Sequence, residues 1–190
     1  MFTSSLHLFS VLPGDFLGGS TFAAAHKGES VLDILNHLNV DYFTLGNHEF
    51  DFGAQNVGEL IDKSNFKWLG SNVRHADTKK LFKTVLDTDV FDVTILSKSE
   101  SCSSNDKEQK EQSKESVRVG VFGVCTQFTP MLSDPGDDVI FEDAFEHSER
   151  CVCILKQQSC DLIVALTHLE LENDKKLAEA LDIDFIIGTT

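Results

Sequence analysis

Three groups of polar residues in the sequence have side chains that can bind metal ions, and each follows an apolar run. They are Gly14-Asp15 with Ser20, Gly46-Asn47-His48-Glu49 with Asp51, and Thr167-His168. A carboxylate, a side-chain amide and an imidazole brought together form an oxygen and nitrogen site that suits a divalent cation. Each group alone also has a plainer explanation: a Gly-Asp turn, a helix cap at Asn47, or a packed histidine at position 168. Their joint occurrence favours a site.

The elements that must position these groups can be read from the apolar pattern. Buried strands are expected at 6–12, 41–45, 66–69, 117–124, 161–167 and 183–187, with a hairpin formed by 81–86 and 90–96. Helical spacing marks 28–39, the stretch around Val57, Leu60 and Ile61, and then 141–158 and 171–181. This alternation predicts an α/β fold with a central, mostly parallel or mixed sheet flanked by helices. The carboxyl ends of parallel strands share one edge, so the three polar groups are expected to meet there.

The length of 190 residues fits a single domain. Within it, the segment 98–116 differs in composition, because it consists mainly of Ser, Lys, Glu and Gln and has no apolar residue besides Cys102. Such a segment cannot bury enough surface to offset the entropy lost on ordering. We therefore predict a disordered insertion at 98–116.

The charge and the cysteines limit the possible partners and compartments. Sixteen Lys and Arg against 31 Asp and Glu give a formal net charge of −15, which argues against binding to nucleic acid or to an anionic membrane. The sequence has no run of 18 apolar residues, so no transmembrane helix is expected. The five cysteines lack a C-x-x-C pair and are expected to be buried, reduced thiols. Because the first residues also lack the pattern of a signal peptide, we expect a cytoplasmic protein.

The three polar groups also resemble a known family. GDFLGGS at 14–20, LGNHEFDFG at 45–53 and ALTHLE at 165–170 are similar to motifs of the metallophosphoesterase (calcineurin-like) superfamily. The match is best to its 5′-nucleotidase and 2′,3′-cyclic-nucleotide phosphodiesterase branch, and it extends from about Leu6 to Gly188 apart from the insertion. The resemblance implies part of a four-layer sandwich of helices and sheets.

The resemblance implies a role for each matching residue. Asp15 would be the carboxylate that bridges two metal ions, and Asn47 and His168 would bind the second ion. His48 would face the scissile phosphate, and Asp51 would orient the His48 ring. The implied cofactors are two divalent ions such as manganese or zinc, and the implied substrate is a small phosphate ester, a nucleotide. The implied reaction is hydrolysis by a metal-activated water.

Other acidic and hydroxyl residues near these motifs receive structural assignments. Glu49 and Ser20 belong to the motifs, and we expect them to form turn hydrogen bonds. Glu170, Glu172 and Asp174 are expected on a solvated face.

The sequence departs from the family pattern in two places. No D-x-H motif precedes Asp15, and His7 lies inside the expected strand, where it is not a substitute. Gly188 is followed by two threonines where the family has G-H-x-H or G-H-x-Q. With three ligands left and no C-terminal nucleotide-binding domain, we expect a partial catalytic domain over 1–190, a fragment of a phosphoric ester hydrolase with impaired activity. The alternative is a degenerate domain that binds a metal or a partner without catalysis.

Overall fold

The fold is a layered α/β arrangement, seen in a computed structural model that describes residues 9–97 and 113–190. In chain order the elements are β1 (Val11–Leu12), α1 (Thr21–His26), α2 (Glu29–His37), β2 (Tyr42–Thr44), the 3₁₀ turn η1 (His48–Phe50), α3 (Gly53–Lys63), β3 (Lys67–Leu69), β4 (Val73–His75), β5 (Thr88–Ser97), β6 (Ser113–Cys125), α4 (Thr129–Leu132), β7 (Val139–Phe141), α5 (Ala144–Gln157), β8 (Leu162–His168), α6 (Leu171–Ala180) and β9 (Phe185–Thr189). The predicted α/β class is confirmed.

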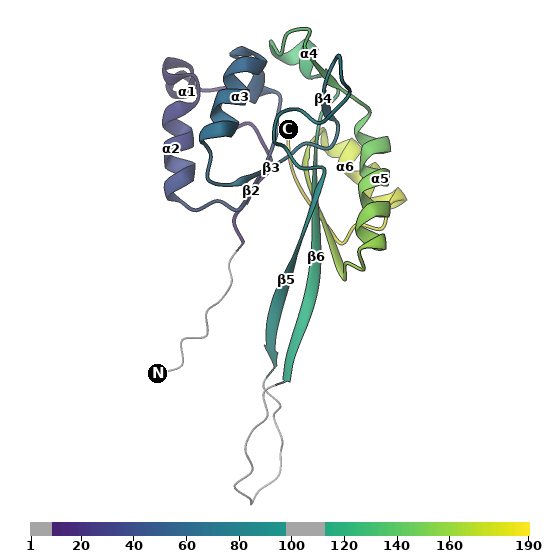
Figure 1. The fold of residues 1–190 in the computed structure, drawn as a ribbon. Coiled ribbons are helices and arrows are strands. Elements are labelled where there is room, and N and C mark those ends of the chain that lie inside the picture. The colour runs from purple at the N-terminus through teal and green to yellow at the C-terminus, as the bar shows by residue number, and fades with distance from the viewer. Residues whose placement is uncertain (1–8, 98–112) are drawn as a thin grey trace, which may run out of the picture.

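The strands form two main sheets and one small pair. The first sheet has the order β1-β2-β3 and is parallel throughout. The second has the order β5-β6-β8-β9, with β5 antiparallel to β6 and the remaining pairs parallel. Strands β4 and β7 form a separate antiparallel pair. In Figure 1, α1, α2 and α3 lie on one side and α5 and α6 on the other, and the β5–β6 hairpin extends away from the rest.

Three apolar clusters separate these layers. Phe43 and Trp68 of the first sheet pack against the buried faces of α2 and α3. Tyr42 and Leu69, on the opposite face of the same strands, join Leu166 of the second sheet in a cluster between the two sheets. A third cluster lies between the second sheet and α5 and α6. Because successive strand residues point to opposite faces, β2 contributes to two cores at once.

The predicted hairpin of 81–86 with 90–96 is wrong. Residues 81–86 form no strand, although Leu81 makes a bridge to Arg74. Phe82 and Val85 are both buried but lie three residues apart, which is not the two-residue spacing of a strand face. They belong to an irregular segment whose side chains pack into the first core. The partner of β5 is β6, with Val93 opposite Val117.

Other boundaries also differ from those predicted. Residues 98–112 of the predicted insertion, and 6–8 of the first predicted strand, lie outside the described residues. Residues 113–116 belong to β6 and pair with 94–97, because the hairpin ladder continues past its apolar part. The sequence pattern did not indicate α1, and it assigned Phe141 to a helix, whereas Phe141 ends β7.

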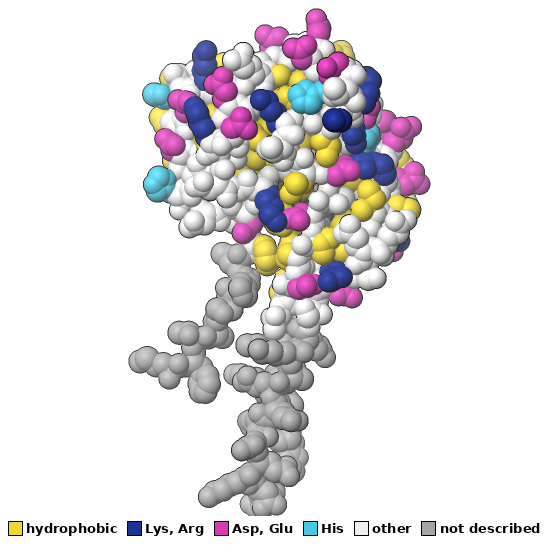
Figure 2. Space-filling view, viewed as in Figure 1, with side chains coloured by type: hydrophobic (Ala, Val, Ile, Leu, Met, Phe, Trp, Pro, Cys, Tyr) yellow, Lys and Arg dark blue, Asp and Glu magenta, His cyan; other side chains and the backbone are white. Residues whose placement is uncertain are grey.

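The surface is acidic and mixed in character. Acidic side chains are scattered over the face in Figure 2, with Lys and Arg side chains between them. Of the four cysteines in the described part of the chain, all free thiols, Cys125 and Cys151 are buried as predicted, but Cys153 is exposed and Cys160 is intermediate. Within that same part, no helix combines the length and apolar character needed to cross a bilayer.

Candidate active site

The three polar groups predicted to converge do so, although they follow strands of two different sheets. Asn47 follows β2, His168 ends β8, and Asp15 follows β1. The Nε2 atom of His168 lies 2.8 Å from Oδ1 of Asn47 and 3.2 Å from Oδ2 of Asp15. Packing of the two sheets through the cluster of Tyr42 and Leu166 brings their strand ends together.

Glycines allow the loops after β1 and β2 to touch. A Cβ atom at Gly14 would lie 2.8 Å from the backbone nitrogen of Gly46, and Gly14 has φ of 97°. A Cβ atom at Gly46 would lie 2.7 Å from the Asp15 nitrogen. Larger residues at either position would separate the two loops, so the sequence motifs GD and GN are steric requirements of this contact.

Glu49 joins the same two loops. It is 1% exposed, and its carboxylate accepts hydrogen bonds from four backbone nitrogens, those of Asp15, Phe16, Leu17 and Gly46. Burial raises the pKa of this carboxyl, and the N–H groups of Leu17, Asp15 and Gly46 act in the opposite direction. The structural role predicted for Glu49 is therefore what the structure shows. Ser20 likewise has its predicted role, because it caps α1 by accepting from the Ala23 nitrogen at 3.0 Å.

His48 and Asp51 form a pair at the edge of the site. Nδ1 of His48 lies 2.8 Å from Oδ2 of Asp51, and the His48 side chain is 41% exposed. Burial alone would lower the pKa of His48, but the hydrogen bond to Asp51 and the charge of Asp15 overcome this and raise it. The imidazole is therefore partly open to solvent, while its Nδ1 is held by the carboxylate.

Asp15 is linked to both histidines. Its Oδ1 accepts from the His48 backbone nitrogen at 2.9 Å, and its Oδ2 faces His168. Burial alone would raise the pKa of Asp15, but the contacts with His168 and His48 outweigh it and lower the pKa. A carboxylate held ionised beside a buried imidazole is a suitable pair of donors for a cation.

Comparisons with known proteins agree with this geometry. No family model matches the chain. The trifunctional nucleotide phosphoesterase protein YfkN of Bacillus subtilis is 27% identical over 92% of this chain and 13% of that protein. The 5′-nucleotidase of Bos taurus is 28% identical over 96% of this chain and 29% of that protein. The chain is therefore similar in sequence to a nucleotide phosphoesterase and to 5′-nucleotidases.

Solved structures share the fold of this chain. The NAD nucleotidase of Haemophilus influenzae superimposes with a TM-score of 0.76 and 26% identity, over 96% of this chain and 32% of that one. The calcineurin-like phosphoesterase YfkN shares the fold, with a TM-score of 0.73 and 21% identity over 95% of this chain and 57% of that chain. This chain spans less than a third of the length of the two curated proteins named above.

The donor atoms of Asp15, Asn47 and His168 fit one divalent ion. Two ligands of one ion, each about 2.1 Å from it, lie about 3.0–3.4 Å apart in octahedral or tetrahedral geometry. The 2.8 and 3.2 Å separations around His168 Nε2 are close to that range. Over 9–97 and 113–190, no cluster of three or more His, Cys, Asp or Glu side chains could hold an ion without the Asn47 amide. The described residues thus supply donors for one ion rather than two.

Asp174 is not on the solvated face where the sequence places it. It lies near Thr167, and a Cβ atom at Gly188 would be 2.6 Å from Thr167 Oγ1 and in contact with the Asp174 carboxylate. Burial raises the pKa of Asp174, while Thr167 and His168 oppose the rise. Glu170 is exposed as predicted. The signal for Asp174 was its position three residues before buried Leu177, on the inward face of α6.

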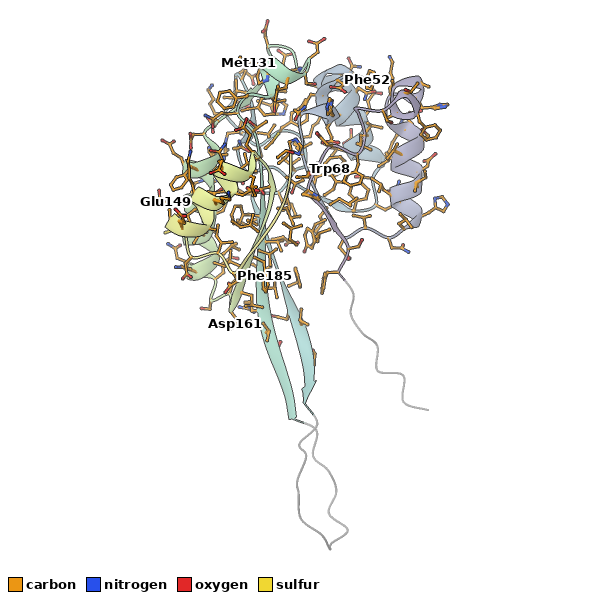
Figure 3. All side chains as sticks on the ribbon, turned by 180° about the vertical axis from the view of Figure 1, so that it is seen from behind. Phe52, Trp68, Met131, Glu149, Asp161 and Phe185 are labelled. Atoms are coloured by element: carbon orange, nitrogen blue, oxygen red, sulfur yellow. The ribbon has the colours of Figure 1, made fainter. Side chains whose placement is uncertain are left out.

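Beside the donors the chain has a pocket of about 400 Å³. Its lining includes Asn47 and His168 together with the apolar side chains of Phe128, Met131 and Leu132. Figure 3 shows Met131 at the end of the molecule where Phe52 also lies, with Asp161, before β8, toward the opposite end. The pocket is therefore at the carboxyl ends of the strands, next to the polar site.

Proposed function

We propose that this chain carries a metal- and phosphate-binding site of a phosphoric ester hydrolase of the 5′-nucleotidase type, with a nucleotide as substrate. One observation carries the proposal. Asp15, Asn47 and His168, up to 153 residues apart in sequence, bring their donor atoms within 3.2 Å of a common nitrogen, beside the His48–Asp51 pair. A chance arrangement would not place three donor types and an oriented histidine together at strand ends.

Different residues of the chain would bind the cation and contact the substrate. Asp15, Asn47 and His168 would hold the cation, which when bound supplies positive charge for the phosphate and acidifies a coordinated water. His48, exposed and with its Nδ1 held by Asp51, would face the substrate through its other ring nitrogen. There it would stabilise charge on the phosphate or give a proton to the leaving oxygen.

The local charge explains why a cation is needed. Three carboxylates lie close together here, those of Asp15, Glu49 and Asp51, and the whole chain has a formal charge of −15. An anionic phosphate ester would be repelled by this arrangement without a metal ion and a protonated His48. The raised pKa of His48 keeps more of it protonated near neutral pH than a free imidazole would be.

The test is phosphate release from adenosine monophosphate by chelator-treated protein to which manganese or zinc is added back. We expect metal-dependent release, slow because three protein donors hold an ion weakly. His48→Ala should lower turnover by about 10²–10⁴-fold, the usual share of a positioned acid or base. His37→Ala is the matched control, since His37 is exposed and its ring Nδ1 contacts the Asp33 carbonyl of its own helix. Equal turnover in the two variants would refute the role of His48.

A second candidate function is a degenerate domain that binds a metal or a partner without catalysis. The donor set favours it, because the described residues supply ligands for one ion. Metal analysis after equilibrium dialysis, combined with the phosphate assay, separates the two: phosphate release that depends on the bound ion supports the hydrolase, and a bound ion with no phosphate release supports the degenerate domain. We propose the cytoplasm as the compartment, on the support of the free thiols in the described part of the chain.

A further inference from the structure

Asp51 has a hydrogen-bond partner far away in the sequence. The Ser133 hydroxyl donates to Oδ1 of Asp51 at 2.9 Å, across 82 residues. The other oxygen, Oδ2, faces His48 Nδ1 at 2.8 Å and accepts from the Gly19 backbone nitrogen at 3.2 Å. Both carboxylate oxygens are therefore engaged, each from a different segment of the chain.

The place of Ser133 is set by the end of α4. Its backbone nitrogen donates to the Thr129 carbonyl at 2.9 Å, and the residue then turns to an extended conformation with φ of −151°. Thr129 is itself fully buried, and its hydroxyl donates to the Thr126 carbonyl at 2.7 Å. The Ser133 hydroxyl is thus presented to Asp51 from a fixed support rather than from a free loop.

We propose that Ser133 is a positioning residue that fixes the Asp51 carboxylate and, through it, the tautomer of His48. The effect of Ser133 on catalysis rests on the proposed function, but its effect on the His48 tautomer can be measured without turnover. The terminal torsion of an aspartate is broad, so a carboxylate held on one side only can rotate. With Oδ1 held by Ser133, Oδ2 stays in line with His48 Nδ1 and keeps a proton on that nitrogen.

A purely structural role for Ser133 would be to attach α4 to the turn η1. Removing the hydroxyl would then loosen α4 but leave the His48–Asp51 hydrogen bond in place, because the two residues are three apart in the same turn. The two roles therefore differ in the state of the His48 ring. Ring nitrogen chemical shifts report that state directly.

The experiment compares wild-type protein with Ser133→Ala and Ser133→Thr, all free of metal at pH 8. Long-range ¹H–¹⁵N correlation of the His48 ring should show the Nδ1-protonated tautomer in the wild type and in Ser133→Thr, which keeps a hydroxyl. Ser133→Ala should shift toward the Nε2-protonated tautomer. Ser64→Ala is the control, because the Ser64 hydroxyl also donates a hydrogen bond, to the Ile61 carbonyl at 2.7 Å, but lies at the end of α3.

Kinetics provide the second readout. Turnover of adenosine monophosphate should fall about tenfold in Ser133→Ala with little change in KM, and should return to within about threefold of wild type in Ser133→Thr. If Ser133→Ala keeps the wild-type tautomer of His48, the inference is overturned. It is also overturned if both variants lose that tautomer, because packing rather than the hydroxyl would then be responsible. If the wild type releases no phosphate, the proposed function fails while the ring spectra still decide the role of Ser133.

Discussion

Replacing Glu49 by glutamine gives the sharpest test of how the site is held together. The change preserves the size of the side chain and turns one carboxylate oxygen into an NH₂ group. Oε1 accepts from Phe16 and Leu17, and Oε2 accepts from Asp15 and Gly46. Whichever way the new amide is turned, its NH₂ group faces two N–H donors and leaves both without an acceptor.

The expected cost follows from the burial of those donors. Each oxygen serves one buried bond, to Leu17 or Gly46, and one partly buried bond. A buried N–H left without a partner costs about 1–3 kcal/mol, and a partly buried one that can regain water costs less. The two remaining bonds also weaken, because a neutral oxygen replaces an anionic one. We therefore expect Glu49→Gln to lower the free energy of unfolding by about 2–4 kcal/mol.

Urea unfolding measures this directly. Trp68 is the one tryptophan of the sequence and is 2% exposed, so its emission reports loss of the first core. Glu59→Gln is the matched control: Glu59 is exposed and accepts from Gln55 at 3.1 Å, so its loss should change stability by less than about 0.5 kcal/mol. A Glu49→Gln variant as stable as Glu59→Gln would refute the reasoning that the carboxylate joins the two loops.

Two further predictions concern parts of the fold outside the site. Burial and the guanidiniums of Arg74 and Arg150 lower the pKa of His147, so folded protein holds it neutral where the unfolded chain protonates it. The free energy of unfolding of the wild type should fall relative to that of His147→Gln as the pH drops below about 6.5, by at most about 1.4 kcal/mol per pH unit. Thermal melts over this pH range measure the difference, and parallel pH profiles of the two proteins would contradict the prediction. Tyr42→Phe removes the 2.8 Å hydrogen bond from the Tyr42 hydroxyl to Asp89 and should cost about 1–2 kcal/mol in urea unfolding, whereas an unchanged midpoint would mean that water replaces the bond.

The helices and strands that depend on local apolar spacing could be predicted from the sequence. The parallel strands of both main sheets, α5 and α6 were predicted because apolar spacing and strand length agree with their burial. The strand predicted at 81–86 is wrong because Phe82 and Val85 pack into the first core from an irregular segment. A short apolar run does not distinguish such a segment from a strand. Phe141 was likewise assigned to a helix because it is a partly buried apolar residue, whereas it ends β7.

The site was predictable where its residues lie in motifs and not where they meet only through tertiary packing. Asp15, Asn47 and His168 stand next to strands, so the rule about strand ends predicted that each lies at the carboxyl end of a strand. It did not predict that these strands belong to two sheets, whose packing brings His168 to the other two residues. Ser133 and Asp174 carry no such local mark. Their contacts, with Asp51 and Thr167, depend on where α4 and α6 pack, and no short-range pattern contains that information.

The arrangement of the donors over two sheets has a mechanical consequence. Asn47 and Asp15 move together, because Glu49 and the Gly14–Gly46 contact join their loops into one unit. His168 belongs to the other sheet and meets that unit only through the packing between the sheets. The distances from His168 Nε2 to the other two proposed donors are therefore set by the inter-sheet core and not by the loops. Affinity for a metal ion should accordingly respond to changes of side-chain volume in that core, while the His48–Asp51 pair, contained in one turn, should not.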